Sequence, residues 1–356
     1  MLDEPVAASK VGARQAFVRW QPLGAILAVM PWNYPYWQVV RFAAPALMSG
    51  NVALLKHASN VPQCALALEA LFIDAGFPVD VFQTLLIEAA TVATVVRDPR
   101  VAAVTVTGSE RAGQSIATDA ASVIKKVVLE LGGSDPFVVL PSADIKAAAK
   151  AATAARFQNA GQSCISAKRF IVHRQCADEF IGAFTRAART LVAGDPLDPS
   201  TDMGPLATER GRSEIEELVA NAMDLGADLL LGGHRIDGPG WFYQATILGN
   251  ITPEMRLFSE EAFGPVATIS VVDSLEDAVR LANSTGFGLG ANVWTRDNAE
   301  QTFAINELQA GAVFINGMTT SYPELPFGGI KRSGYGRELA AFGLREFCNA
   351  KTVWIG

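Results

Sequence analysis

Short β-rich runs alternate with amphipathic helical patterns from residue 24 to residue 140, and this alternation constrains the fold more than any other sequence feature. Apolar residues recur at helical spacing over 61–75, where Pro62 suits the first turn of a helix and Gly76 ends it. Such alternation favours a parallel sheet with crossover helices. The predicted strands are 24–29, 51–56, 81–86, 102–107, 126–131 and 136–140.

A second alternating block follows, so the sequence predicts an α/β protein with two doubly wound domains. Segments 194–205, 232–240 and the Gly-rich 326–336 are predicted to be loops. Helices are predicted at 145–159, 177–192, 209–225, 275–284 and 298–308, and strands at 169–173, 266–272, 290–295 and 311–316.

Two β-rich segments near the ends of the chain, 14–21 and 351–355, lie outside this alternation. They are interpreted either as extended arms that pair with another subunit or as frayed terminal strands. The pattern alone favours neither alternative.

Composition excludes several classes of protein. The 356 residues are 50% hydrophobic with a formal net charge of −7. No run of Lys or Arg is longer than a pair, and such pairs predict solvated surface rather than a nucleic-acid site. No apolar run reaches membrane-spanning length and the first residues hold no apolar signal core, so we expect a cytoplasmic protein. Four widely spaced Cys and three His predict no disulfide and no metal site. The basic pairs are Lys125-Lys126, Lys168-Arg169 and Lys331-Arg332.

Three short segments carry residues suited to thioester chemistry: Cys164 in Asn159-Ala-Gly-Gln-Ser-Cys, Glu130 in Glu-Leu-Gly-Gly, and Asn33 in Met30-Pro-Trp-Asn-Tyr-Pro. A thiolate attacks a carbonyl, an amide and the Cys164 N–H stabilise the oxyanion, and a carboxylate activates water. Each residue also has an ordinary reading: a small buried hydrophobe for the Cys, a strand end in solvent for the Glu, and a turn residue for the Asn.

A strand, Gly turn and helix are predicted around Gly108-Ser109, and a helix N-terminus of this kind suits a phosphate. Lys56 ends a predicted strand, where it would reach a ribose or phosphate or else lie exposed on the surface. The segment 286–290 follows a helix rather than a strand, so it is interpreted as a helix stop.

Taken together, the residues resemble the NAD(P)-dependent aldehyde dehydrogenase superfamily over nearly the whole chain. The resemblance implies that Cys164 forms a thiohemiacetal, that hydride passes to nicotinamide, and that water activated by Glu130 hydrolyses the thioester. Asn33 and the Cys164 N–H would form the oxyanion hole. The matching motifs are Met30-Pro-Trp-Asn-Tyr-Pro, Lys56-His-Ala-Ser, Thr107-Gly-Ser, Glu130-Leu-Gly-Gly, Gly161-Gln-Ser-Cys, Glu260-Glu-Ala-Phe-Gly-Pro and Pro326-Phe-Gly-Gly.

The same resemblance implies a cofactor site. Where this chain has Ser59, family members that use NAD carry a Glu that would repel a 2′-phosphate, so NADP is expected to be accepted and preferred, with NAD as the alternative. The implied cofactor residues are Trp32, Lys56, Ser59, Gly108, Ser109, Glu261 and Phe263.

Within the superfamily the chain is similar to bacterial succinate-semialdehyde dehydrogenases. Arg41 and Ser321 match the residues that hold the distal carboxylate of the substrate, while Gln158 replaces a second arginine. Phe42 stands where many members have a Lys, and Ser166 replaces a redox-active Cys. Two alternatives stay open: a broad-range aldehyde dehydrogenase, and a catalytically silent fragment that binds nucleotide or partner subunits.

The resemblance also implies a domain organisation. Residues 1–22 would begin an oligomerisation arm, 23–132 would form a cofactor-binding domain, 133–332 a catalytic domain, and 333–356 a return segment and arm strand. Family subunits carry roughly a hundred further residues before the point matching Leu2, so the cofactor domain is expected to be N-terminally incomplete. A dimer or tetramer is expected.

Overall fold

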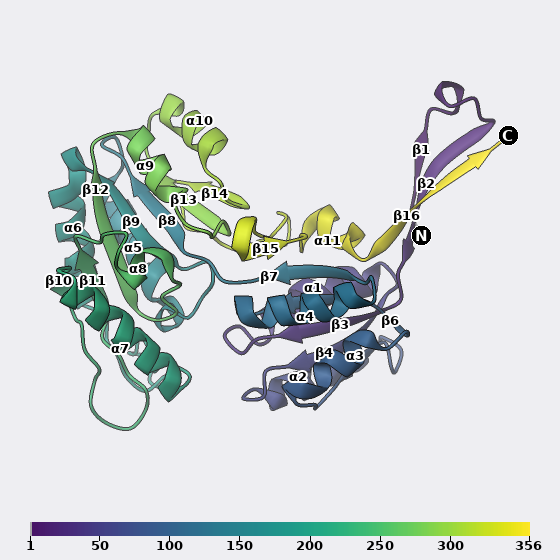
Figure 1. The fold of residues 1–356 in the computed structure, drawn as a ribbon, viewed down its shortest axis with the longest axis horizontal. Helices are drawn as coiled ribbons and strands as arrows, with labels where there is room; N and C mark the ends of the chain where they lie inside the picture. Colours follow the sequence, from purple (N-terminus) through teal and green to yellow (C-terminus); the bar gives the residue numbers. More distant parts are fainter. Residues whose placement is uncertain (1) are drawn as a thin grey trace. The chain divides into compact units, whose positions relative to one another are not determined.

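The structure of this protein, a computed structural model, describes residues 2–356. The chain divides into two compact units, drawn as a ribbon in Figure 1. Unit 1 contains the chain up to Leu131 together with Ser321–Gly328 and Gly334–Gly356. Unit 2 contains Gly132–Thr320 and Gly329–Ser333.

Unit 1 is built on a six-stranded sheet in the order β15-β7-β6-β3-β4-β5, parallel except for β15. Its strands are β3 (Ala25–Met30), β4 (Val52–His57), β5 (Phe82–Thr84), β6 (Val101–Thr107), β7 (Lys126–Glu130) and β15 (Gly334–Tyr335). Its helices are α1 (Trp37–Met48), α2 (Pro62–Asp74), α3 (Val92–Arg97), α4 (Glu110–Ser122) and α11 (Ala340–Glu346), with 3-10 turns at Ala8–Lys10 and Ala89–Thr91.

Helices cover both faces of this sheet, because alternate residues of each strand point to opposite sides. On β3, Ile26 and Ala28 pack in one apolar cluster with residues of α1 and α2. Leu27, between them, packs in a second cluster with residues of α3 and α4. The central strand is therefore buried on both faces, as expected for a doubly wound sheet.

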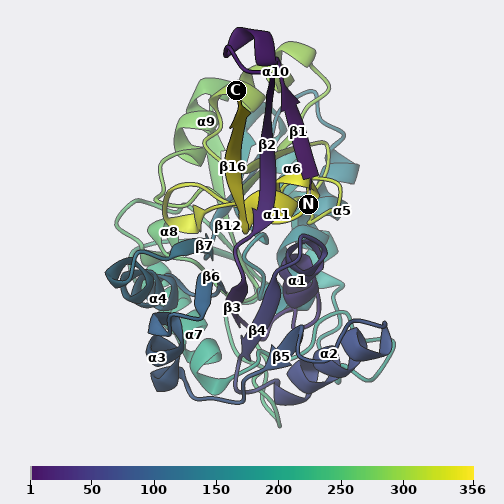
Figure 2. The same cartoon turned by 90° about the vertical axis from the view of Figure 1, so that its right-hand side faces the viewer.

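Unit 1 also holds a separate three-stranded antiparallel sheet in the order β1-β2-β16. Its strands are β1 (Leu2–Val6), β2 (Gln15–Pro22) and β16 (Cys348–Ile355), and Figure 2 shows them side by side. The two predicted arm segments thus pair with each other within one chain, with Gln15 opposite Ile355 and Pro22 opposite Cys348. Neither interpretation of these segments from the sequence included that pairing.

Unit 2 is built on a seven-stranded sheet in the order β10-β11-β12-β9-β8-β13-β14, parallel except between β10 and β11. Its strands are β8 (Asp135–Val139), β9 (Ala167–His173), β10 (Asp228–Leu231), β11 (Thr246–Gly249), β12 (Val266–Val272), β13 (Gly290–Trp294) and β14 (Ala312–Ile315). Its helices are α5 (Ile145–Phe157), α6 (Arg174–Arg189), α7 (Glu209–Asp224), α8 (Arg256–Ser259), α9 (Leu275–Ala282) and α10 (Asn298–Glu307), with 3-10 turns at Gln158–Gly161 and Lys331–Ser333.

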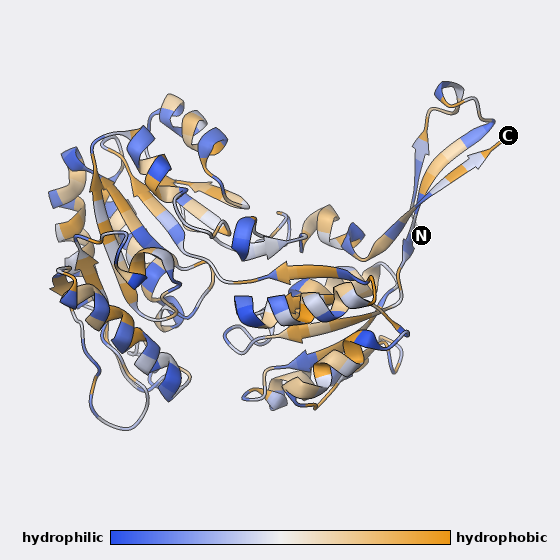
Figure 3. Ribbon diagram, in the orientation of Figure 1, coloured by the Kyte–Doolittle hydropathy of each residue, from blue (hydrophilic) through white to orange (hydrophobic). Residues whose placement is uncertain are grey.

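The two faces of the second sheet are also covered. Phe137 and Phe170 pack with residues of α5, α6 and α7 in the largest apolar cluster, in which Phe170 and Phe184 have ring centroids 4.6 Å apart. Val138 and Ile171 point the other way and pack with residues of α9 and α10. Figure 3 shows that the strands of this sheet are largely hydrophobic and that its helices are of mixed polarity.

Several predicted boundaries change in the structure. The helix predicted at 177–192 begins at Arg174, where the His173 side chain accepts a hydrogen bond from the Gln175 N–H, and it ends at Arg189. Segment 326–336 is not all loop, because Gly334 and Tyr335 pair with β7. No helix in the described part of the chain is both long and apolar enough to cross a membrane.

Candidate active site

The predicted catalytic and cofactor residues of unit 1 lie at or just beyond the carboxyl ends of four neighbouring parallel strands, β7, β6, β3 and β4. In open α/β sheets this edge forms the crevice in which ligands bind. The parallel pairing therefore brings these residues to one edge of the sheet. They are Trp32 and Asn33 after β3, Lys56 and Ser59 at the end of β4, Gly108 and Ser109 after β6, and Glu130 at the end of β7.

His57 ties the loop that carries Trp32 and Asn33 to the end of β4. Its Nε2 lies 2.9 Å from the Pro35 carbonyl oxygen, and its Nδ1 lies 3.2 Å from the Met30 carbonyl oxygen and 2.9 Å from the Ala58 nitrogen. Burial lowers the pKa of His57, which favours the neutral imidazole. The loop is thus tied to the end of β4 through both ring nitrogens.

Lys56 and Ser59 line one groove of about 490 Å³, together with the start of α2 and residues of the segment 85–89. Two strands away along the same edge, after β6, the Ser109 hydroxyl caps α4 by accepting from the Ala112 N–H at 3.3 Å. The remaining N–H groups and the positive dipole end of a 13-residue helix suit a phosphate. Along the carboxyl edge of its sheet, unit 1 therefore offers the Lys56 cation, the Ser59 hydroxyl and the N-terminus of α4.

Glu130 is buried, with 2% of its surface exposed, and neither of its carboxylate oxygens accepts a hydrogen bond from the described residues. Burial raises the pKa of Glu130 well above its usual range, the Glu338 carboxylate raises it further, and Arg41 and Arg337 oppose the shift. The sequence alternative of a strand-end Glu in solvent is therefore wrong. A raised pKa makes this carboxyl a proton acceptor of useful basicity once it ionises.

Arg41 has a carboxylate partner in its own chain. It is 3% exposed, its Nε donates to Glu338, and its guanidinium lies 4.1 Å from the centre of the Phe327 ring. The predicted role of Arg41 toward a substrate carboxylate remains a prediction. Ser321, its predicted helper, has a buried hydroxyl without a hydrogen bond to the described residues. Phe42 packs edge-on against Phe347.

In unit 2 the loop before Cys164 is set by three consecutive residues with positive φ: Asn159 (52°), Ala160 (52°) and Gly161 (72°). The first two store backbone strain, because residues with a Cβ disfavour this region. A Cβ at Gly161 would lie 2.3 Å from both the Arg156 guanidinium and the Gly264 carbonyl oxygen, so only glycine fits there. The loop ends α5 and presents Cys164, which is partly exposed rather than buried as a small hydrophobe.

Two buried cations hold this loop. Arg156, at 0% exposure, donates to the carbonyls of Gly161 at 2.7 Å and Gly264 at 2.5 Å. Lys168, at 2% exposure, donates to the carbonyls of Ser163, Cys164 and Ser166 at 3.0, 3.0 and 3.1 Å. Main-chain oxygens that water would otherwise solvate are thus paired inside the unit.

Glu261 lies beside the same cations. Its carboxylate is 3.5 Å from the Lys168 ammonium and accepts the Gly133 N–H at 3.0 Å. A Cβ at Gly133 would come within 2.6 Å of the Cys164 carbonyl oxygen, so the close approach of these backbones requires glycine. Burial raises the pKa of Glu261 and Lys168 opposes the shift. Unit 2 therefore brings Cys164 and Glu261 together.

These loops precede β8, β9 and β12, which are parallel neighbours in the sheet, so this part of the site lies at the amino ends of the strands. Phe263, in the same loop as Glu261, is half-buried. Gln158 lies apart, in a groove of about 500 Å³ between α5 and α6 that also contains Lys146, Lys150 and Arg186. Among residues 2–356, no three His, Cys, Asp or Glu side chains are grouped so as to hold a metal ion.

The sequence model of the aldehyde dehydrogenase family matches residues 2–353. The chain belongs to the aldehyde dehydrogenase family. It is 60% identical over 356 residues to a succinate-semialdehyde dehydrogenase [NADP(+)] of Mycobacterium avium (strain 104), covering 100% of this chain and 75% of that protein. It is also 60% identical over 355 residues to succinate-semialdehyde dehydrogenase [NADP(+)] 1 of Mycobacterium tuberculosis (strain ATCC 25618 / H37Rv), covering 100% of this chain and 78% of that one.

Solved structures agree with the family assignment. The crystal structure of succinic semialdehyde dehydrogenase from Streptococcus pyogenes, in complex with NADP+ as the cofactor, matches with a TM-score of 0.96 and 40% identity. The match covers 99% of this chain and 77% of that chain. The predicted family and the predicted α/β fold of this aldehyde dehydrogenase are thereby confirmed.

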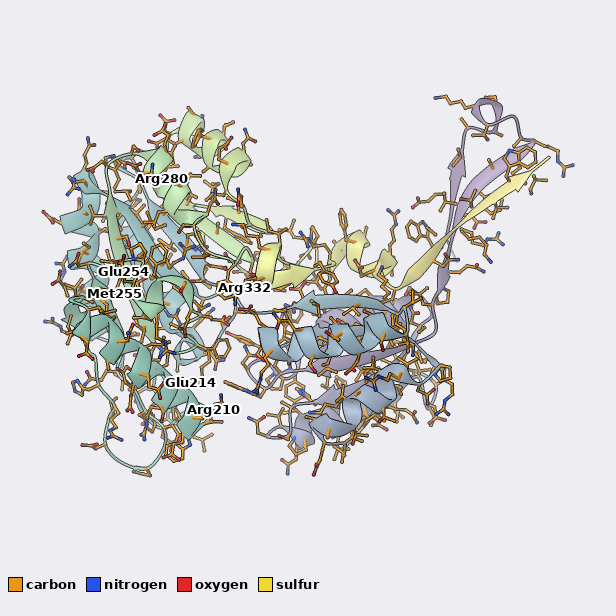
Figure 4. All side chains as sticks on the ribbon, viewed as in Figure 1. Arg210, Glu214, Glu254, Met255, Arg280 and Arg332 are labelled. Carbon is orange, nitrogen blue, oxygen red and sulfur yellow. The ribbon has the colours of Figure 1, made fainter. Side chains whose placement is uncertain are left out.

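Sequence reasoning missed the cations that shape the site of this aldehyde dehydrogenase. The pair Lys168-Arg169 was predicted to be solvated surface, and that is wrong, because the two residues are 2% and 6% exposed. Both residues lie in β9, which is buried on both faces, so their side chains point to opposite sides of the sheet and both are in the interior. There each donates to main-chain carbonyls. By contrast, the exposed Arg210 and Glu214 of α7, labelled in Figure 4, form a 2.8 Å ion pair that adds little stability.

Replacing Arg156 by Met is expected to lower the free energy of unfolding by about 3–5 kcal/mol, because buried carbonyls would lose their donors while the apolar stem is retained. Thermal unfolding followed by circular dichroism measures this loss. Lys150→Met, at an exposed position of the same helix, is the matched control and should change stability by less than about 0.5 kcal/mol. Equal melting curves for the two variants would contradict the role of Arg156.

Proposed function

We propose that this aldehyde dehydrogenase oxidises succinate semialdehyde, or a similar short aldehyde with a distal carboxylate, with NADP+. The observation that carries the proposal is 60% identity along the whole chain to relatives named for that reaction and cofactor. The buried cations around the Cys164 turn support it, because a precisely held nucleophile is what acyl transfer requires.

The proposed chemistry assigns one step to each residue. The Cys164 thiolate attacks the aldehyde carbon, and the Asn33 amide and the Cys164 N–H donate hydrogen bonds to the resulting oxyanion. Loss of hydride converts the thiohemiacetal to a thioester. Glu130 then takes a proton from water, which attacks the thioester and releases the carboxylate and the Cys164 thiol. Aldehyde, NADP+ and water are thus converted to carboxylate, NADPH and two protons.

The residues of unit 1 fit a dinucleotide with a 2′-phosphate. The groove lined by Lys56 and Ser59 contains a cation and no carboxylate at position 59, and Glu88 lines it as well. The N-terminus of α4 beside Gly108 and Ser109 suits the pyrophosphate. Trp32 and Phe263 would supply apolar contacts and Glu261 would accept the hydroxyls of a ribose. Bound NADP+ supplies the hydride acceptor.

The test is formation of NADPH by the purified chain with succinate semialdehyde and NADP+, compared with butanal as the neutral substrate of similar size. Preference of more than about tenfold in kcat/KM for the semialdehyde, which is 1.4 kcal/mol, supports recognition of the distal carboxylate by Arg41 and Ser321. A smaller ratio would favour a broad-range aldehyde dehydrogenase. That alternative is considered because Gln158 replaces a second arginine that would bind the distal carboxylate. No NADPH from either substrate would contradict the proposed function.

Ser59→Glu is expected to shift the ratio of kcat/KM for NADP+ over NAD+ toward NAD+ by about tenfold or more, since a carboxylate in this groove would face the 2′-phosphate. Steady-state kinetics with each cofactor at varied concentration measures the ratio. Ser59→Gln, which is similar in size but uncharged, separates repulsion from crowding. An unchanged ratio in Ser59→Glu would contradict the role of Ser59.

We also propose that the chain self-associates as a dimer or tetramer through the sheet of β1, β2 and β16, whose outer strands present unpaired edges. A monomer by light scattering at micromolar concentration would contradict this. A reducing cytoplasm is the proposed location, because Cys164 must stay a free thiol to react.

A further inference from the structure

One buried ammonium contacts both the nucleophile turn and the carboxylate that we assign to the cofactor. The Lys168 Nζ donates to the carbonyls of Ser163, Cys164 and Ser166, and the Glu261 carboxylate lies 3.5 Å from the same nitrogen. An ammonium has three protons, so the three carbonyls use all of them and Glu261 acts as the counter-charge. None of the thioester steps described above makes use of this lysine.

The charged groups that act on Lys168 come from β8, α5, the Cys164 turn and the loop before β12. Asp135 on β8 and Glu261 before β12 are the carboxylates, Arg156 on α5 is a second cation, and Cys164 is the thiol. Burial lowers the pKa of Lys168, whereas Glu261, Asp135 and the Cys164 thiolate raise it. Because such interactions are reciprocal, a protonated Lys168 favours the thiolate of Cys164 and a fully charged Glu261 partly cancels that effect.

We propose that Lys168 is a positioning residue that couples Cys164 to Glu261: it holds the nucleophile turn by its carbonyls and makes the thiol more acidic when a ligand engages the Glu261 carboxylate. This inference rests on the proposed function, in which a cofactor ribose donates hydrogen bonds to Glu261. Those hydrogen bonds reduce the extent to which Glu261 neutralises the Lys168 ammonium. The positive charge of Lys168 then stabilises the Cys164 thiolate more strongly. The cofactor thereby prepares the nucleophile before any aldehyde binds.

The experiment measures the rate of alkylation of Cys164 by iodoacetamide as a function of pH, with and without NADP+, by mass spectrometry of the peptide that contains Cys164. In the unmodified enzyme NADP+ should move the midpoint of the profile to lower pH. Without cofactor, Lys168→Met should move the midpoint up by about one pH unit or more, because removing a nearby opposite charge disfavours the thiolate. NADP+ should then move it less than in the unmodified enzyme.

Arg169→Met is the matched control. Arg169 is adjacent, buried and cationic, but its donors go to the carbonyls of Ser134, Leu281 and Ala282 rather than to the Cys164 turn. Arg169 also interacts with Asp135, whose pKa burial raises to about 7. The Arg169→Met variant therefore controls for any effect on Cys164 that is transmitted through the Asp135 carboxyl. Its alkylation midpoint should stay within a few tenths of a pH unit of the unmodified enzyme.

Two further variants keep the inference testable if Lys168→Met does not fold. Glu261→Gln removes the counter-charge and should lower the midpoint without cofactor, while Lys168→Arg keeps the charge and should restore most of the profile. An unchanged midpoint in Lys168→Met or Glu261→Gln, or equal shifts in Lys168→Met and Arg169→Met, would overturn the inference. Alkylation needs no turnover, so failure of the proposed function would appear separately, as absence of NADPH formation.

Discussion

Replacing Cys164 by serine is expected to lower kcat for aldehyde oxidation by on the order of 10⁴-fold. A serine hydroxyl in the same turn stays protonated at neutral pH, and it has no base assigned to take its proton, whereas a thiol is partly ionised there and intrinsically more nucleophilic. The substitution changes one atom in a partly exposed side chain, so the carbonyls held by Arg156 and Lys168 keep their donors.

The measurement is NADPH formation with succinate semialdehyde over several enzyme concentrations, which detects a small residual rate. Cys348→Ser, at another partly exposed cysteine but in strand β16, is the control and should retain full activity. Residual activity of Cys164→Ser above about one hundredth of the unmodified rate would mean that another group attacks the aldehyde.

Replacing Glu130 by Gln is expected to stop the reaction after the first oxidation. NADPH should appear in a burst of about one equivalent per active site, followed by a steady-state rate lowered by about 10²–10³-fold, since thioester hydrolysis loses its general base. The raised pKa of Glu130 fixes the sign of the pH effect. In the unmodified enzyme the hydrolysis rate should rise with pH as this carboxyl ionises, and in Glu130→Gln that rise should be absent.

Rapid mixing resolves the burst, and added hydroxylamine should restore turnover of Glu130→Gln, because a strong nucleophile needs no base to cleave a thioester. Glu179→Gln, at an exposed position of α6, is the control for loss of a carboxylate. A slow rate without a burst would place the role of Glu130 before hydride transfer instead.

The fold was largely predictable because its strands are buried on both faces. Runs such as 102–107 and 266–272 are short and rich in β-branched residues, with helical patterns between them, and the structure places β6 and β12 there. Strands β10 and β11 were missed because they lie close to a Gly-rich excursion, and β10 has exposed residues at Asp228 and Leu229. Gly334–Tyr335 is too short to show a period of its own.

Residue type was enough to propose the residues of the candidate site, but the buried charges that hold its loops could not be predicted from the sequence. Nothing local distinguishes Lys168 from a surface lysine, since its burial depends on carbonyls contributed by a loop that reverses through Asn159 and Ala160. The partner of Arg41 was equally hidden, because Glu338 lies 297 residues further along the chain. Contacts of this kind follow from the closed fold and have no signature in sequence spacing.

The pairing of β2 with β16 also determines the order in which a ribosome can complete the two units. Strand β2 is synthesised long before β16 and cannot pair with it until that strand has emerged, and β7 likewise waits for β15. Unit 2 is nearly continuous from Gly132 to Thr320, so it can close first, while the nascent N-terminal part still carries open strand edges. During translation, chaperone binding is therefore expected to concentrate on the part of unit 1 that precedes unit 2 in the chain.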